Sequence, residues 1–217
     1  MVENWKPRID IDSDWPVVLL GDHIDFLSGL TLSIPDCEAP GGTPIISMNS
    51  LTEDGELIKE GIRTIELPNK KNIIYLKKGD LLFNWRNGSR RLVGKTGYFD
   101  WEGNYVFASF LLGIRPRPNS YNSRFLWILL NQFRREGSYE NFMRQNVNGL
   151  FNREELKILP VPLPRIEIQQ RIVSQIDTER TFISTNKDLI ILFEQKIKDR
   201  IARVWGSKIN KSNYAII

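Results

Sequence analysis

The chain has 217 residues, 41% hydrophobic and 26% charged, which suits one ordinary domain plus a small accessory element and excludes a disordered or fibrous protein. A single cysteine and a single histidine exclude an internal disulfide framework, a cysteine zinc site and a histidine-rich metal centre. The net charge of +4 conceals an asymmetry, because residues 1–60 hold 12 acidic and 3 basic side chains (net −9) and leave +13 for the remainder.

The start of the chain predicts a loose arm and then a strand. Residues 1–14 are polar and acidic and lack the apolar centre of a signal peptide. Since no run approaches the roughly 20 apolar residues of a membrane span, we expect a cytoplasmic protein without membrane contact. Residues 15–21 form an apolar run typical of a strand or a packed anchor. His23 has no catalytic partners near it in the sequence, so we expect a surface or turn position.

Short apolar runs alternate with turn signals through the next part of the chain. Residues 28–44 are rich in glycine, proline, serine and threonine and predict a loop. The predicted strands are 44–48, 72–76, 81–85, 93–99 and 105–114. Turns at Asp54–Gly55, Gly79–Asp80 and 101–104 separate several of them. This pattern indicates a curled, mixed or antiparallel sheet, and with the helices that follow it predicts an α+β fold.

Helical periodicity begins after residue 120. Apolar residues at three- and four-residue spacing predict a helix over 123–136, which Asn122 can cap and Gly137 can end. A weaker helical stretch is predicted over 139–145, and a short turn from Asn152 to Leu156. Alternating prolines in residues 158–164 predict a stiff, extended connector.

Residues 165–205 contain no proline or glycine and predict one long helix. Isoleucine or valine recurs every seven residues, which indicates a coiled-coil seam. The candidate dimerisation residues are Ile172, Ile176, Ile183, Ile190, Phe193, Ile197 and Val204, and the polar Glu179, Asn186 and Arg200 interrupt the seam. We expect a second copy of the chain to supply the partner helix; the alternative is packing against its own domain. The predicted organisation is a domain over 1–164, the helix over 165–205 and a flexible tail over 206–217.

The segment 84–95 holds four bases and no acid between two predicted strands. Arginine can bind guanine with two hydrogen bonds, asparagine can do the same with adenine, and positive charge attracts phosphate. With the charge asymmetry, this favours nucleic-acid binding; the alternatives are solvated surface charges and a neutral mixed surface. The candidate DNA contacts are Trp85, Arg86, Asn87, Ser89, Arg90, Arg91, Lys95, Lys70, Lys71, Arg144, Asn146 and Asn148.

Catalytic and cofactor motifs are missing from the sequence. Residues 88–96 do not match a phosphate-binding loop, because Ser89 stands where its first glycine belongs, and no dinucleotide-binding glycine motif occurs. We therefore expect no catalytic residue, metal or cofactor in this chain. Two other functions stay open: a metal-dependent enzyme of nucleic acids, and an assembly or inhibitor module that does not bind DNA.

Three passages together resemble the specificity subunit of type I restriction-modification systems. Residues 15–22 are similar to the opening of its target recognition domain, and residues 78–83 (Lys-Gly-Asp-Leu-Leu-Phe) resemble its Gly-Asp-Leu-Leu-Phe signature. Residues 159–173 resemble the proline-rich passage that joins this domain to a long helix. They depart from it at Arg165, where a second proline is common, and at Ile168.

The resemblance covers most of residues 15–204, and it implies half of a specificity subunit, with one target recognition domain and one long helix instead of two of each. Two copies would pair through antiparallel helices and recognise a symmetric, bipartite site in double-stranded DNA. The resemblance implies two further partners: an adenine methyltransferase subunit, which binds S-adenosylmethionine, and a restriction subunit that translocates and cleaves DNA.

Overall fold

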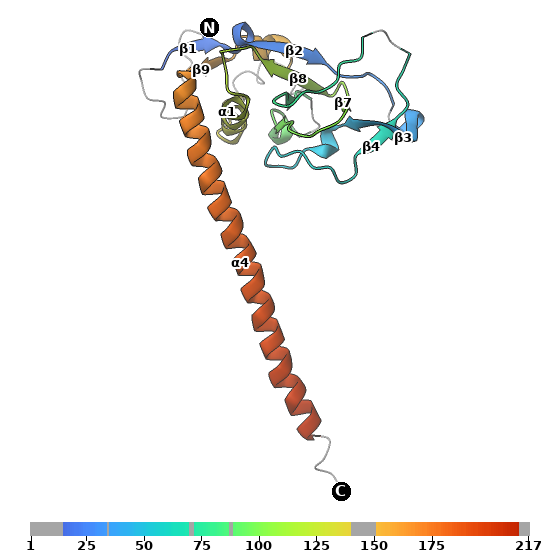
Figure 1. The fold of residues 1–217 in the computed structure, drawn as a ribbon, viewed down its shortest axis with the longest axis vertical. Helices are drawn as coiled ribbons and strands as arrows, with labels where there is room; N and C mark the ends of the chain where they lie inside the picture. Colours follow the sequence, from blue (N-terminus) through green and yellow to red (C-terminus); the bar gives the residue numbers. More distant parts are fainter. Residues whose placement is uncertain (1–14, 34, 70–71, 87–88, 140–150, 213–217) are drawn as a thin grey trace. The chain divides into compact units, whose positions relative to one another are not determined.

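The computed structural model describes residues 15–33, 35–69, 72–86, 89–139 and 151–212. The chain divides into two compact units, one that continues to Gln170 and one that starts at Arg171. The first unit is the α+β domain, and the second is the greater part of one long helix (Figure 1). The predicted arm, residues 1–14, lies outside the described residues.

Within the described residues, the strands form two sheets and one strand pair. The four-stranded sheet is antiparallel, in the order β2-β8-β5-β6, and the three-stranded sheet has the order β4-β3-β7, with β3 and β7 parallel. The strands are β1 (Val17–Leu19), β2 (Ile24–Ser28), β3 (Glu38–Ile46), β4 (Arg63–Ile65), β5 (Leu81–Asn84), β6 (Thr96–Tyr98), β7 (Val106–Phe107), β8 (Leu111–Pro116) and β9 (Pro160–Pro162). The predicted mixed or antiparallel α+β fold is confirmed.

Helix α1 (Ser123–Arg135) forms where the periodicity predicted it. The side chain of Asn122 caps it by accepting hydrogen bonds from the backbone N–H groups of Arg124 and Phe125. Two buried side chains of α1 bind strand β6. The Trp127 indole donates to the carbonyl of Thr96, and the Asn131 amide bonds both backbone groups of Thr96. These bonds satisfy polar groups that burial would otherwise leave unpaired.

The proline-rich connector is a strand. Strand β9 pairs with β1 in antiparallel register, Val18 opposite Val161, and the two lie side by side in Figure 1. Helix α3 (Arg153–Lys157) precedes it, capped by Asn152 as predicted. The buried Gln169 then binds the first turn of the next helix to the domain: its amide donates to the carbonyls of Ser120 and Pro164 and accepts from the N–H of Asn122.

Helix α4 (Ile166–Ser212) begins one residue from the predicted start and runs past the predicted end. The backbone of residues 206–212 is helical, so α4 extends into the predicted tail, while 213–217 lie outside the described part. One internal glycine, Gly206, costs a helix only about 1 kcal/mol, which is too little to end it. Within the described residues, no helix combines the length and apolar character needed to cross a membrane.

Two predictions about the sheet region are wrong. Residues 72–76 form no strand; Ile74 and Leu76 pack against the core around Leu82 and Phe107, and Leu76 N–H bonds the carbonyl of Tyr105. The predicted loop 28–44 contains the first part of β3. Its register with β4 shifts between Glu38 and Thr43, where Gly41 adopts a positive φ of 77°. Glycine tolerates this conformation, so a glycine-rich segment can pair as a bulged strand.

Alkaline pH is expected to destabilise the domain through two buried tyrosines. Tyr121 and Tyr139 donate hydrogen bonds to the carbonyls of Pro162 and Leu130, and burial raises the pKa of both side chains. Above about pH 10 the tyrosines of the unfolded chain ionise while the folded ones stay neutral, so the stability that is present below pH 10 is lost as pH rises. Each tyrosine contributes up to about 1.4 kcal/mol per pH unit there.

Urea unfolding between pH 8 and pH 11 measures this loss. The double variant Tyr121→Phe, Tyr139→Phe should have a lower stability at pH 8, because two hydrogen bonds are gone, but a flatter pH dependence above pH 10. An equally steep alkaline loss in the double variant would contradict the assignment.

Candidate nucleic-acid interface

The basic loop, defined here as residues 85–95, leaves the buried strand β5 and returns to β6. Asn84 closes its base: its N–H donates to the carbonyl of Lys95 at 2.7 Å, its carbonyl accepts from the N–H of Gly94, and its side chain donates to the carbonyl of Leu92. Gly94 has a positive φ of 87°, and a Cβ there would overlap the ring of Tyr139. The two ends of the loop are therefore held together at the sheet.

Trp85 is a packing anchor. Its indole N–H donates to the carbonyl of Ser109 at 2.9 Å, its own carbonyl accepts from the N–H of Phe151, and its side chain is half-buried. It also lines a cavity of about 370 Å³ together with Thr31, Asn152 and Arg153. Of the two roles that the sequence left open, packing or stacking against a base, these contacts support packing.

Arg86 is the exposed cation at the start of the loop. Its guanidinium lies over the ring of Phe110, 6.0 Å from the ring centre, and it has no acidic partner within the part of the chain that the structure describes. Phe110 itself is 44% exposed, at the turn between β7 and β8. A cation and an aromatic ring side by side on the surface are the groups that contact phosphate and stack on bases.

Arg91 is exposed but already paired. Its guanidinium lies 2.6 Å from the Glu53 carboxylate, and its carbonyl accepts a hydrogen bond from Arg134. Arg134 also donates to the carbonyl of Glu53 at 2.7 Å. Phosphate would have to compete with Glu53 for Arg91, so this arginine is a weaker candidate than Arg86.

Lys95 lies inside the domain and not on its surface. It is 7% exposed, and its ammonium donates to the carbonyl of Leu51 at 3.0 Å. Burial, with the nearby charge of Arg134, lowers the pKa of the Lys95 amine. A side chain held in this way cannot reach DNA, so the prediction that Lys95 contacts DNA is wrong. Lys95 directly precedes β6, and its side chain is buried in the domain.

Of the other candidate DNA contacts, the structure describes the side chain of one. Ser89 is exposed on the loop. The remaining candidates lie outside the residues or side chains that the structure describes: Lys70, Lys71, Asn87, Arg90, Arg144, Asn146 and Asn148. The helical stretch predicted over 139–145 also falls largely in that range, with only Tyr139 described.

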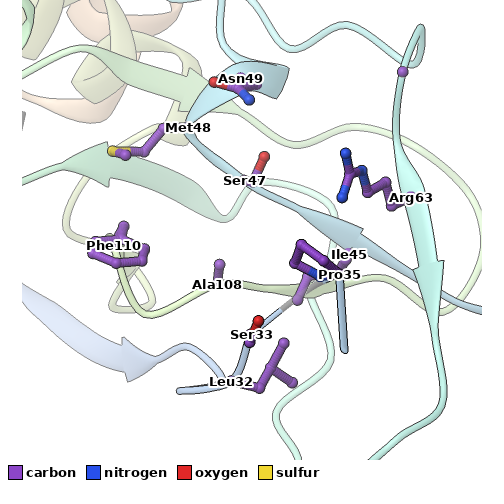
Figure 2. Close-up of a pocket in the computed structure, with 11 residues that line it drawn as sticks. Leu32, Ser33, Pro35, Ile45, Ser47, Met48, Asn49, Arg63, Ala108 and Phe110 are labelled. Carbon is purple, nitrogen blue, oxygen red and sulfur yellow. The ribbon is translucent and has the colours of Figure 1, made fainter. Parts of the chain in front are cut away.

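A cavity of about 380 Å³ is lined in part by Phe110, the residue over whose ring the Arg86 guanidinium lies (Figure 2). Figure 2 shows Phe110 on one side of it and Arg63, from β4, on the other, with Ser47 between them. Arg63 is half-exposed, with Glu38 at 3.6 Å. The lining residues are Leu32, Ser33, Pro35, Ile45, Ser47, Met48, Asn49, Gly61, Arg63, Ala108 and Phe110. Hydroxyl, amide and guanidinium groups above an apolar floor can bond the edge of a base and contact its face.

Folding brings some acidic residues from the first part of the chain next to basic residues from the later part. Carboxylates from the first sixty residues form ion pairs with arginines from later in the chain, which are Glu38–Arg63, Glu53–Arg91, Asp25–Arg117 and Asp54–Arg135. Among the described residues, acidic side chains therefore pair with several of the bases that the sequence offered, and Arg86 is the best-defined exposed base of the loop. Phe110, Arg63 and Asn49 could not be identified from the sequence. Phe110 lies in an apolar stretch that predicts a continuous strand, and the other two come to line the same cavity only through tertiary folding.

The described residues hold no group of three or more histidine, cysteine, aspartate or glutamate side chains that could bind a metal ion. His23 packs edge-on against the ring of Tyr121, at 6.0 Å between ring centres. Asp80, in the Gly-Asp-Leu-Leu-Phe passage, is buried and paired with Arg115. Both contacts are structural.

The candidate dimerisation residues lie along α4. Ile183, Ile190, Phe193, Ile197 and Val204 are each between 53% and 58% exposed, while Ile172 and Ile176 are partly buried. Other apolar side chains on this helix are exposed as well, including Phe182 and Leu189. These side chains are therefore largely exposed.

Comparison with known proteins adds a family and a fold. The model of the Type I restriction modification DNA specificity domain matches residues 12–195. Two curated relatives come from Methanocaldococcus jannaschii: the putative type I restriction enzyme MjaX specificity subunit, 27% identical over 205 residues, and the type I restriction enzyme MjaVIII specificity subunit, 23% identical over 206. The alignments cover 89% of this chain but 47% and 43% of the relatives, so the chain spans less than half of their length.

Solved structures share the fold. A chain from a structure of a type I R-M system, described for its complex assembly and conformational transition, superposes with a TM-score of 0.66 at 22% identity, covering 89% of this chain and 45% of its own length. The HsdS subunit from Thermoanaerobacter tengcongensis gives 0.60 at 21% identity, covering 83% and 41%. Since the family model spans most of the sequence, and passages 15–22, 78–83 and 159–173 lie within it, the chain belongs to the type I restriction-modification DNA specificity domain family.

Proposed function

We propose that this chain recognises DNA sequence for a type I restriction-modification system and leaves the chemistry to partner subunits. The observation that carries the proposal is the family match over residues 12–195, together with a surface at which Arg86, Phe110 and the polar side chains of a cavity meet. Such a surface supplies a phosphate contact, a ring face and hydrogen-bonding groups at one place.

We further propose that two copies act together. The chain spans less than half of its curated relatives, and it has one recognition domain and one long helix with an exposed apolar seam. A two-fold dimer supplies two recognition surfaces in inverted orientation, so it binds a bipartite site with two inverted half-sites. The methyltransferase subunit, carrying S-adenosylmethionine, and the restriction subunit dock on this dimer.

Arg86→Ala is expected to weaken DNA binding. If Arg86 contacts a base, the loss should be about 1–3 kcal/mol and limited to the recognised sequence; if it contacts phosphate, the loss should be the same for all sequences and the salt dependence shallower. Gel-shift titration of the purified chain on duplex DNA at several salt concentrations measures both. Phe110→Ala, beside it, should also weaken binding.

Arg117→Ala is the matched control. Arg117 is an exposed arginine that follows strand β8 at the end opposite to the basic loop, because Leu111 pairs with Asn84 while Pro116 pairs with Ile24. Removing it should leave DNA affinity unchanged. Equal affinities of the wild type, Arg86→Ala and Phe110→Ala would contradict the proposed interface.

The same preparation separates the other two functions. Cleavage of DNA by the chain alone with magnesium would contradict the specificity role and favour a metal-dependent enzyme. Failure to bind any duplex at low salt, even with the methyltransferase present, would favour an assembly or inhibitor module.

A further inference from the structure

The apolar and charged residues on the exposed part of α4 restrict how two copies of the helix can align. The inference drawn from them rests on the proposed pairing of two copies. With Ile176, Ile183, Ile190, Ile197 and Val204 at position a of the heptad, position d holds Glu179, Asn186, Phe193 and Arg200. Position e holds Arg180, Lys187, Glu194 and Ile201, and position g holds Phe182, Leu189, Lys196 and Arg203. Every one of these residues from 181 to 205 is exposed.

Antiparallel helices obey a simple rule of register. Each a residue packs opposite a d residue of the other helix, while e residues face e residues and g residues face g residues. Registers that keep the apolar seam together therefore differ by whole heptads. Near the middle of the helix there are three of them, in which Ile190 faces Phe193, Asn186 or Arg200 of the second copy.

We infer that two copies pair antiparallel with Ile190 of each facing Phe193 of the other. In this register Lys187 faces Glu194 of the second copy, and the two-fold symmetry makes this ion pair twice. Lys187 and Glu194 are exposed and form no ion pair within the described residues, so both are available. At the other flank, position g brings no like charges together: Leu189 faces Lys196 and Phe182 faces Arg203.

Charge disfavours the two neighbouring registers. When Ile190 faces Asn186, Lys187 faces its own copy across the two-fold axis, although Arg180 then meets Glu194. When Ile190 faces Arg200, Glu194 faces its own copy and so does Lys196. Like charges held opposite each other destabilise a helix pair, whereas the inferred register contains none at the e and g positions.

The length of the free helix points to the same register. The second unit starts at Arg171, and α4 ends at Ser212. With Ile190 opposite Phe193, Arg171 of one copy is level with Ser212 of the other, so the free helices overlap from end to end. With Ile190 opposite Asn186, residues 206–212 run past the partner's free helix. With Ile190 opposite Arg200, residues 171–177 have no helix to face.

Charge reversal tests the ion pair. Lys187→Glu should weaken the dimer about tenfold, because two attractive pairs become two repulsive ones. The double variant Lys187→Glu, Glu194→Lys should restore the affinity. Asp188→Lys, a charge reversal at the next residue but at position f outside the seam, is the control and should change nothing. Sedimentation velocity over a concentration series measures the dissociation constants.

Cysteine pairs test the register directly. Cys37 is the single native cysteine, so all variants carry Cys37→Ser. Asn186→Cys with Ile197→Cys should give a disulfide-linked dimer on oxidation, since these positions face each other only in the inferred register. Two further cysteine pairs test the neighbouring registers: Ile183→Cys with Phe193→Cys, and Ile190→Cys with Arg200→Cys. Both should form far less disulfide-linked dimer. Ile190→Cys alone should not link, and it reports a parallel pair.

The outcomes separate the register from the pairing. A dimer that links through one of the other cysteine pairs, and in which the double charge reversal fails to rescue Lys187→Glu, overturns the register and leaves the pairing intact. A chain that sediments as a monomer at every concentration overturns both.

Discussion

Replacing Asp80 with asparagine is expected to destabilise the recognition domain by about 3 kcal/mol, because it leaves a partly buried arginine without its counter-charge. Asp80 is 1% exposed, and both of its carboxylate oxygens bind Arg115, at 2.7 Å to Nε and 2.6 Å to Nη2. One of them also accepts the N–H of Lys77 at 2.8 Å, which holds the turn before β5. The pair joins the residue before β5 to β8, and these are the two inner strands of the larger sheet.

Urea unfolding followed by tryptophan fluorescence measures this effect. Glu102→Gln is the control, since Glu102 pairs with Lys78 in the same turn region but both side chains are exposed, and such pairs add little to stability. Its unfolding midpoint should not move. A midpoint for Asp80→Asn that equals that of Glu102→Gln would contradict a structural role for the buried pair.

Replacing Ile190 with aspartate is expected to turn the proposed dimer into a monomer. Pairing of two helices would bury this position, and an aspartate there loses its hydration without gaining a partner, once in each copy. The dissociation constant should rise about a hundredfold or more. Ile183→Asp, one heptad earlier, should act in the same way. Sedimentation velocity at several protein concentrations measures the change.

Ala202→Asp adds the same charge to an exposed position of the same helix, outside the seam. It should leave the dimer unchanged, and circular dichroism should show that all three variants keep their helix. Since Ile190 and Ile183 lie in the second unit, the recognition domain should fold as before. An Ile190→Asp variant that still sediments as a dimer would contradict the pairing of copies through this seam.

Features encoded by local pattern could be predicted from the sequence. The spacing of apolar residues and the cap at Asn122 predicted α1 to within one residue of its observed end, and the absence of proline and glycine from residues 165–205 predicted α4. The passage around Asp80 could be recognised as a family signature, but its physical reason, the ion pair with Arg115, joins residues far apart in the sequence. It became visible only in the fold.

The proposed recognition surface could be predicted only in part, for the same reason. Lys95 belongs to a basic run, but its position beside β6 buries it against the carbonyl of Leu51. Arg91 belongs to the same run, yet Glu53, from a distant segment, pairs with it. Phe110 has no distinguishing local signal, and its importance comes from the guanidinium of Arg86 over its ring. Charge along a sequence does not say which charges meet after folding.

The central claim is that two identical copies recognise DNA together, and mapping of methylated adenines tests it most directly. Genomic DNA from the organism that carries this gene should be compared with DNA from a strain in which the gene is deleted. The account predicts a methylated motif that is present only with the gene and consists of two inverted half-sites separated by a fixed spacer. An asymmetric bipartite motif, a single undivided motif, or no gene-dependent methylation at all would contradict it.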